Sequence, residues 1–222
     1  PIRQPQNRND IDDADHIAPK TENASLLNSL PTSILVNPIA LNRERQRNHS
    51  SSMSREQNQQ FGGDHYSFSR MTWIKPNFLW MMYRCGWAEK ENQERVLGIW
   101  MSKKGFIRIL EEAVYSSFQA DVYPSYENWK AELENKNVRL QWDPDHDIHG
   151  EKQERRAIQL GLKGEIVKEF NEEMIKEVID LTSFVKEQKA LIDAGKLDKL
   201  IVPSETIFTT EIEELDRKLK LT

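Results

Sequence analysis

The stretch Arg70–Gly86, RMTWIKPNFLWMMYRCG, decides the fold prediction because it joins an extended segment to a buried helix. Lys75 precedes a proline and is therefore biased away from helix, so the residues before it should be extended. Pro76 suits the first position of a helix, and Gly86 suits the residue just after its end. Because the residues between them are large and apolar nearly all round, we expect a buried helix over residues 77–84.

The sequence beyond this stretch carries a mixture of strand and helix patterns. Apolar and polar residues alternate over 138–142 and over 158–162, which is typical of half-buried strands. Residues 174–181 fit either a helix face or a short strand. The remaining expectations are a strand over 95–101, a helix after Ser102 that reaches Ala113, a helix after Ser125, a helix near 166–170 and a last helix that follows Thr182 or Ser183 and ends at Gly195. The predicted fold class is α+β: a single domain with a small mixed sheet packed with several helices.

Composition divides the chain into unequal parts. Residues 1–60 contain no Phe, Trp or Tyr, whereas all six tryptophans lie between Trp73 and Trp142. A segment without aromatic residues buries too little apolar area to offset its chain entropy. We therefore expect a disordered or weakly ordered N-terminal tail over 1–60, a domain over 61–203 and a charged C-terminal tail over 204–222. An apolar island at residues 33–41 is either a short strand docking on the domain edge or not ordered.

Charge and cysteine content narrow the class of protein. The net charge is −5 and no segment is strongly basic, which argues against a large nonspecific nucleic-acid footprint. The single cysteine, Cys85, excludes a disulfide framework and fits a cytoplasmic or nuclear location, of which we expect the cytoplasmic one. No apolar run approaches the ~20 residues needed to span a bilayer, so we expect no membrane partner.

Cations and tryptophans interleave in the first part of the domain. The residues concerned are Arg70, Lys75 and Arg84, with Trp73, Trp80 and Trp87 between and after them. Such interleaving can clamp a phosphate and stack a base. The seven-residue spacing of the tryptophans is also about two helical turns, so a packed core with cations at its rim explains the same pattern.

Polar residues on the two half-buried strands form a second candidate site. Arg139 and Gln141 lie opposite the apolar positions of one strand, and Gln159 lies opposite those of the other, near Arg155 or Arg156. If the strands are neighbours, these side chains share one sheet face, where arginine and glutamine offer paired donors to phosphate, carboxylate or base edges. A solvated sheet face would give the same pattern.

Two acidic residues are candidates for catalysis. Asp143 ends a strand and Glu94 precedes one, so either side chain could orient a hydroxyl or handle a proton; a solvated turn also accounts for Glu94. The run from Asp143 to Glu154 has the acidic spacing of a calcium loop, but Ile148 stands where that loop requires glycine. We therefore expect a solvated turn and no metal there.

The stretch Arg70–Arg84 resembles an uncharacterised family, the domain of unknown function numbered 4291. Further similar stretches are Gln93–Leu97, Val138–Pro144 and Arg156–Leu162, and the similarity covers roughly residues 70–200. The resemblance implies a strand around 175–182, between two helices. Members of the family carry a short strand before the tryptophan-rich motif that we do not find in 1–69. The family's order of elements is similar to that of ADP-ribosyltransferases, which is an analogy at the level of the fold.

Two hypotheses of function follow from these patterns. The first is a ligand-binding, enzyme-like domain that recognises a phosphate-bearing nucleotide or the end of a nucleic acid, with a transferase activity implied by the analogy. The second is a non-enzymatic protein-interaction module with a structural tryptophan-rich core. The sequence identifies no cofactor. In the first hypothesis the ligand-binding residues are Arg70, Trp73, Lys75, Arg84, Arg139, Gln141, Arg156 and Gln159, and the catalytic residues are Glu94 and Asp143.

Overall fold

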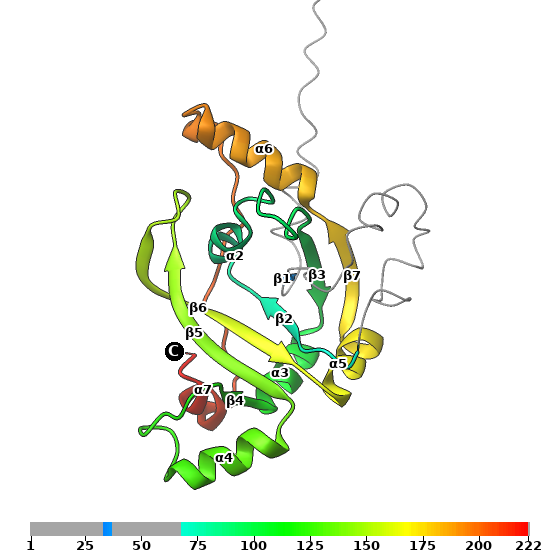
Figure 1. Cartoon of the computed structure of the whole chain (residues 1–222), viewed down its shortest axis with the longest axis vertical. Helices are drawn as coiled ribbons and strands as arrows, with labels where there is room; N and C mark the ends of the chain where they lie inside the picture. The colour runs from blue at the N-terminus through cyan, green and yellow to red at the C-terminus, as the bar shows by residue number, and fades with distance from the viewer. Residues whose placement is uncertain (1–32, 37–67, 222) are drawn as a thin grey trace, which may run out of the picture.

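The computed structural model describes residues 33–36, as backbone only, and residues 68–221. The fold is α+β, with one mixed sheet whose seven strands are ordered β4-β5-β6-β2-β1-β3-β7 (Figure 1). The strands are β1 Ser33–Val36, β2 Thr72–Lys75, β3 Leu97–Met101, β4 Ala113–Tyr115, β5 Val138–His146, β6 Lys152–Leu162 and β7 Ile175–Asp180. The helices are α2 Phe78–Cys85, α3 Lys103–Glu111, α4 Tyr126–Asn135, α5 Glu165–Glu169, α6 Thr182–Asp193 and α7 Glu213–Leu219, with a π-helical turn at Phe170–Met174 and a 3₁₀ turn at Leu197–Lys199.

The expected elements form where local sequence signals are strong. Gly86 ends α2 in the left-handed conformation, with φ 57°, as its lack of a side chain allows. The hydroxyls of Ser102 and Ser125 accept hydrogen bonds from the backbone of Gly105 and Asn128, so both serines cap helices as predicted. Residues 175–180 form a strand, β7, as the family resemblance implied.

Three boundaries differ from the sequence prediction. Ala113 begins strand β4 instead of extending α3, because α3 ends at Glu111 and β4 then pairs with β5 in parallel. Strand β5 continues past Asp143 to His146, and β6 begins at Lys152, because the two strands form one long antiparallel pair. Local turn signals suggested an earlier end than this pairing allows.

Strand β1 lies in the interior of the sheet. It pairs with β2 on one side and with β3 on the other, both antiparallel. The apolar island at 33–41 therefore supplies an inner strand, and the expectation that such a strand would dock on the edge is wrong. Ser33–Val36 are the part of the expected N-terminal tail that the structure describes, and the rest of residues 1–60 lies outside the described residues.

Apolar side chains bury both faces of the sheet, in two clusters. Strand β3 shows the division, because Ile99 and Met101 join one cluster and Trp100 between them joins the other. The first cluster also contains Phe106 of α3, and the second contains residues of α2 and α6, so helices cover both faces.

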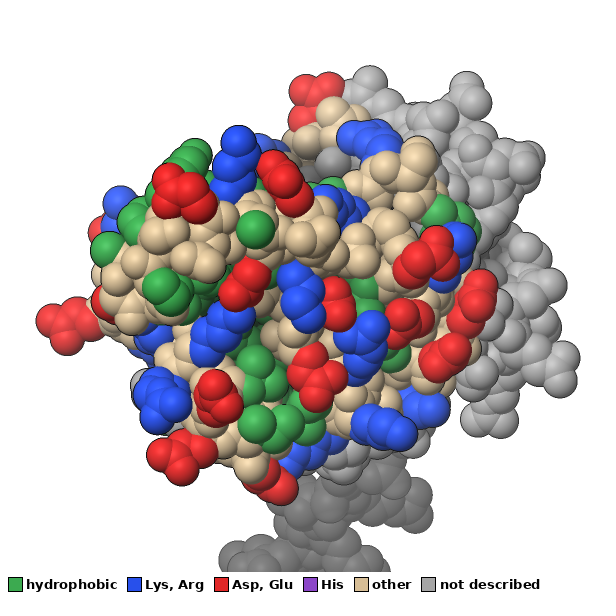
Figure 2. Space-filling model, turned by 90° about the horizontal axis from the view of Figure 1, so that it is seen from below, with side chains coloured by type: hydrophobic (Ala, Val, Ile, Leu, Met, Phe, Trp, Pro, Cys, Tyr) green, Lys and Arg blue, Asp and Glu red, His purple; other side chains and the backbone are tan. Residues whose placement is uncertain are grey.

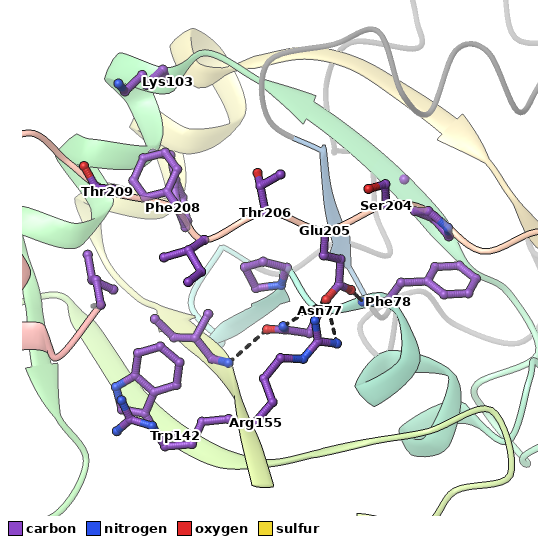
Figure 3. Close-up of a pocket in the computed structure, with 18 of the residues that line it drawn as sticks. Asn77, Phe78, Lys103, Trp142, Arg155, Ser204, Glu205, Thr206, Phe208 and Thr209 are labelled. Carbon is purple, nitrogen blue, oxygen red and sulfur yellow. Dashed lines mark hydrogen bonds and ion pairs between the residues drawn. The ribbon is translucent and has the colours of Figure 1, made fainter. Parts of the chain in front are cut away.

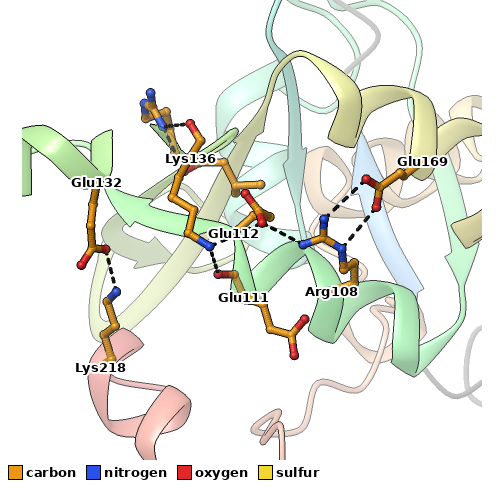
Figure 4. Close-up of polar contacts among 9 residues, drawn as sticks. Arg108, Glu111, Glu112, Glu132, Lys136, Glu169 and Lys218 are labelled. Atoms are coloured by element: carbon orange, nitrogen blue, oxygen red, sulfur yellow. Dashed lines mark hydrogen bonds and ion pairs between the residues drawn. The ribbon is translucent and has the colours of Figure 1, made fainter. Parts of the chain in front are cut away.

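The C-terminal residues pack on the rest of the domain. The segment expected as a charged tail, 204–222, contains α7, whose Leu219 is fully buried in the first cluster. Ion pairs tie the neighbouring helices together (Figure 4): Arg108 joins Glu112 and Glu169, and Lys218 of α7 reaches Glu132 of α4 at 2.7 Å. Exposed pairs of this kind contribute little each, so the buried leucine is the main anchor of α7.

Candidate functional site

Seven of the polar and aromatic side chains singled out in the sequence lie together where α2 faces β2, β5 and β6. Alternation along the strands explains the position of most of them: Ile74 enters the first core cluster, so Trp73 and Lys75 point to the opposite face. Gln141 pairs in register with Gln159 on the neighbouring strand. We call this group the Lys75 cluster; its members are Trp73, Lys75, Trp80, Arg84, Gln141, Asp143 and Gln159.

Lys75 is the most buried charged member of the cluster, at 3% exposure. Its ammonium lies 6.0 Å from the ring centre of Trp73 and 5.8 Å from that of Trp80, a cation–π arrangement. The pKa of Lys75 is lowered from 10.5 to about 8, mainly by burial and next by the charge of Arg84, while the charge of Asp143 opposes the shift. Near neutral pH this amine is therefore close to the pH at which it gains or loses a proton.

Asp143 presents a fixed carboxylate beside this lysine. Gln141 Nε2 donates to Asp143 Oδ1 at 2.9 Å, and Gln159 Nε2 donates to Asp143 Oδ2 at 2.8 Å. Each oxygen thus has an amide donor and keeps lone pairs for a further partner. A half-buried carboxylate with both oxygens held in this way keeps a defined orientation, which suits an acid–base group.

Three predicted residues lie outside the Lys75 cluster. The guanidinium of Arg139 donates to the backbone carbonyls of Leu133, Lys136 and Val138, so it satisfies the C-terminal end of α4. Arg156 lies over the ring of Trp142 at 4.6 Å, on the opposite sheet face. Arg70 is exposed before β2 begins.

Glu94 also lies apart. It is in the loop between α2 and β3, where its Oε1 accepts from the backbone of Asn92 at 3.0 Å. Within residues 68–221, no contact that the structure describes joins Glu94 to Lys75 or Asp143. Of the two acids proposed for catalysis, Asp143 alone lies beside the other candidate side chains.

Sequence reasoning missed a second polar group next to the Lys75 cluster. The ring of Tyr83 on α2 stacks on His146 of β5, with centroids 3.6 Å apart and planes 8° apart. Asp145 is fully buried and pairs with Arg155 at 2.6 Å, and Arg155 also reaches Glu205 at 3.0 Å. Glu205 belongs to the C-terminal segment, and no periodicity or motif indicated that it would reach this place.

A cavity of about 1000 Å³ adjoins these residues (Figure 3). Its walls include Asn77 and Phe78 at the start of α2, Trp142 of β5 and Phe208 of the C-terminal segment. Figure 3 shows Glu205 pointing from that segment toward Asn77, Phe78 and Arg155. The cavity lies beside the first half of β6, which pairs with β5 but not with β2. Strand β6 pairs with β2 from Leu160 to Leu162.

The described residues contain neither a cluster of metal ligands nor a helix that could span a membrane. Within the described residues, no three side chains of histidine, cysteine, aspartate or glutamate come together as metal ligands. In the suspected calcium loop, Asp147 Oδ1 accepts from the backbone N–H groups of His149 and Glu151, which is a turn geometry. No helix among residues 68–221 is long and apolar enough to cross a membrane.

The fold and the Lys75 cluster define an α+β domain with a polar site against one sheet face. The family model described as Domain of unknown function (DUF4291) matches residues 49–208, and the chain belongs to this family. Strand β1 precedes the matched region. No curated protein and no solved structure matched the chain.

Proposed function

We propose that the chain is a ligand-binding, enzyme-like domain that recognises a phosphate-bearing nucleotide or the end of a nucleic acid at the Lys75 cluster. The observation that carries this proposal is the position of Lys75, whose buried ammonium lies between two indole rings and beside Asp143. Burying a charge costs free energy, and folded proteins keep such groups mainly where they serve a site.

The members of the Lys75 cluster would contact different parts of the ligand. Arg84 and Lys75 supply positive charge for a phosphate, and the half-buried Trp73 offers a ring face for a base. Asp143, fixed by two glutamines, orients a hydroxyl or accepts its proton. Lys75, with its pKa lowered to about 8, can give or take a proton in the same step.

A small ligand fits the charge distribution better than a long nucleic acid. On the face drawn in Figure 2, acidic and basic side chains are mixed, and no area of one sign dominates. Long nucleic acids are bound through extended basic surfaces that contact many phosphates. The proposal is therefore confined to a nucleotide or to a terminal nucleotide.

Thermal-shift titration with NAD, ATP, GTP and a short RNA tests the proposal. We expect at least one ligand to raise the melting temperature of the wild-type chain, and Arg84→Ala and Asp143→Asn to remove that rise. Lys168→Ala is the matched control, because Lys168 is an exposed cation on α5 that pairs with Glu165. The proposal fails if no ligand shifts the melting temperature, or if the cluster variants respond as the control does.

The interaction-module hypothesis remains the second candidate, and one observation favours it. Several large apolar side chains are exposed in the C-terminal segment. They are Leu197, Ile201, Val202, Ile207 and Ile212, with exposures from 38% to 79%. Exposed apolar patches often mark protein contacts. Absence of any nucleotide response, together with self-association that Ile207→Ser abolishes, would favour this reading.

A further inference from the structure

The cavity of about 1000 Å³ is distinct from the Lys75 cluster and carries an inference of its own. One wall is formed by residues 203–211, which we call the strap; it connects α6 to α7 (Figure 1). The side chains that line the cavity include four cations, Lys103, Arg155, Arg156 and Lys220.

Both acidic residues that line the cavity come from the strap. Glu205 pairs with Arg155 at 3.0 Å, and Glu211 pairs with Lys103 at 2.5 Å. Without the strap, the described lining would hold four cations and no carboxylate. Arg155 would keep Asp145 as a partner behind it, and Lys220 would keep Asp121, but Lys103 would lose the partner that the strap provides.

The carboxylate of Glu205 occupies a ready-made anion site. Its Oε1 accepts from the backbone N–H of Phe78 at 2.6 Å, and its Oε2 lies 3.4 Å from Asn77 Nδ2. Asn77 precedes α2 but does not cap it, because its Oδ1 accepts from the backbone of Ile158. The start of the helix is therefore satisfied by a carboxylate 127 residues away, in the position that an external oxyanion would take.

A second donor, which is unpaired, is buried at the cavity wall. Trp100 lines the cavity and is 3% exposed, and its indole N–H has no hydrogen-bond partner among the residues that the structure describes. Buried donors are nearly always paired, so an unpaired one beside a cavity indicates an acceptor that binds there.

Backbone hydrogen bonds hold the strap near its ends, and the ring of Phe208 packs against Phe106 with centroids 4.9 Å apart. The backbone N–H of Ile201 donates to Gln188 at 2.8 Å, and that of Thr210 donates to Asp216 at 2.9 Å. Between these anchors the chain has no helix or strand, and Ile207 is 79% exposed. Among the residues that the structure describes, Glu205 makes the polar contacts between the middle of the strap and the cavity wall. Releasing Glu205 would therefore loosen the strap around residues 204–207, while the end anchors and the packing of Phe208 remain.

We propose that the strap is an internal stand-in for a phosphate-bearing ligand, and that a phosphate group of that ligand binds the cavity by displacing the carboxylate of Glu205. The ligand's oxyanions would take over the N–H of Phe78 and the guanidinium of Arg155. This inference does not rest on the function proposed for the Lys75 cluster.

Calorimetric titration of the full chain with pyrophosphate, at constant ionic strength, tests the inference. Because Glu205→Gln weakens the internal competitor, we expect it to bind pyrophosphate about tenfold more tightly than the wild type. Glu213→Gln, which removes the same charge from an exposed site on α7, should leave the affinity unchanged. Adding Arg155→Met to Glu205→Gln should cancel the gain.

Proteolysis provides a readout of strap movement. Chymotrypsin should cut after Phe208 faster in Glu205→Gln than in the wild type, and pyrophosphate should speed that cut in the wild type. If Glu205→Gln does not melt cooperatively, Glu205→Asp, whose shorter side chain weakens the contact with the N–H of Phe78, replaces it in the same comparison.

The inference is overturned if no variant binds pyrophosphate. It is also overturned if Glu213→Gln gains affinity as much as Glu205→Gln does, because the gain would then reflect net charge alone. Asp143→Asn should leave pyrophosphate binding intact, because Asp143 belongs to the Lys75 cluster. Failure of the strap inference can therefore be distinguished from failure of the nucleotide proposal.

Discussion

Gln159 Nε2 donates a 2.8 Å hydrogen bond to Asp143 Oδ2 across the β5–β6 pair. The bond joins residues on neighbouring strands, and Gln141 holds the other oxygen of the same carboxylate. The carboxylate of Asp143 is therefore fixed by the sheet, which is a rigid element. Its negative charge, which raises the pKa of Lys75, has a defined position for the same reason.

Replacing Lys75 by methionine should make the protein more stable. The substitution keeps an apolar stem of similar length and removes a buried ammonium, while Asp143 retains both of its amide donors. We expect a gain on the order of 2 kcal/mol at pH 7, measured by urea unfolding. A loss of stability would show that the ammonium is a structural partner of Asp143.

The difference in unfolding free energy between Lys75→Met and the wild type should depend on pH, because of the pKa of Lys75. In the folded chain this pKa is about 8, below its value of 10.5 in the unfolded chain. Between these values the unfolded chain binds more protons, so the wild type gains stability relative to Lys75→Met as the pH rises from 8 to 10.5. The advantage of Lys75→Met should therefore shrink across this window, and a constant difference would contradict the lowered pKa.

Arg139→Ala should lower stability and leave ligand affinity unchanged. The substitution leaves the carbonyls of Leu133, Lys136 and Val138 without the guanidinium that they now share, which we expect to cost about 1–3 kcal/mol in thermal unfolding. Lys130→Ala, on the exposed side of α4, is the control. Loss of nucleotide response in a folded Arg139→Ala would instead restore the binding role suggested by the sequence.

Leu219→Ala should destabilise the domain by about 2–5 kcal/mol, because the side chain is fully buried in the first core cluster. The backbone oxygen of the same residue accepts from the indole of Trp142 at 3.0 Å. Leu197→Ala removes an equal volume from a side chain that is 45% exposed, and it should cost far less. Equal effects in denaturant titrations would mean that α7 frays in solution.

The thiol of Cys85 should resist labelling in the folded protein. The residue is fully buried, and burial raises the pKa of the thiol, so little thiolate is present or accessible near neutral pH. Because the chain has one cysteine, labelling by an aromatic disulfide reagent can be followed without ambiguity. Labelling in the native state at the rate of free glutathione would contradict this expectation, and rapid labelling in denaturant is the control.

Local signals accounted for most of the secondary structure. Proline and glycine bounded α2, serines capped α3 and α4, and alternation marked β5 and β6. The failures lie where pairing overrode local signals: Ala113 left its expected helix for β4, and β5 ran through Asp143 to His146. These choices depend on a strand partner that a short sequence window does not contain.

The candidate site was predictable only in part, for the same reason. Alternation placed Gln141 opposite the apolar positions of β5 and Gln159 opposite those of β6, so their shared face followed once the strands paired. Nothing in the pattern distinguished Arg139, which caps α4, from Gln141, which holds Asp143. The two residues lie on one strand, and the difference arises from which neighbours reach them.

The sequence by itself determined the α+β class, the end of α2 at Gly86, the starts of α3 and α4 at their serine caps, and which side of β5 and β6 is polar, because these depend on contacts among residues close in the chain. Only the tertiary structure decided that Lys75 is buried between two indoles and that Glu205 occupies the start of α2. The contact between Glu205 and Phe78 joins residues 127 positions apart. Such contacts depend on the packing of the whole sheet and on the path of the strap. No local propensity encodes them.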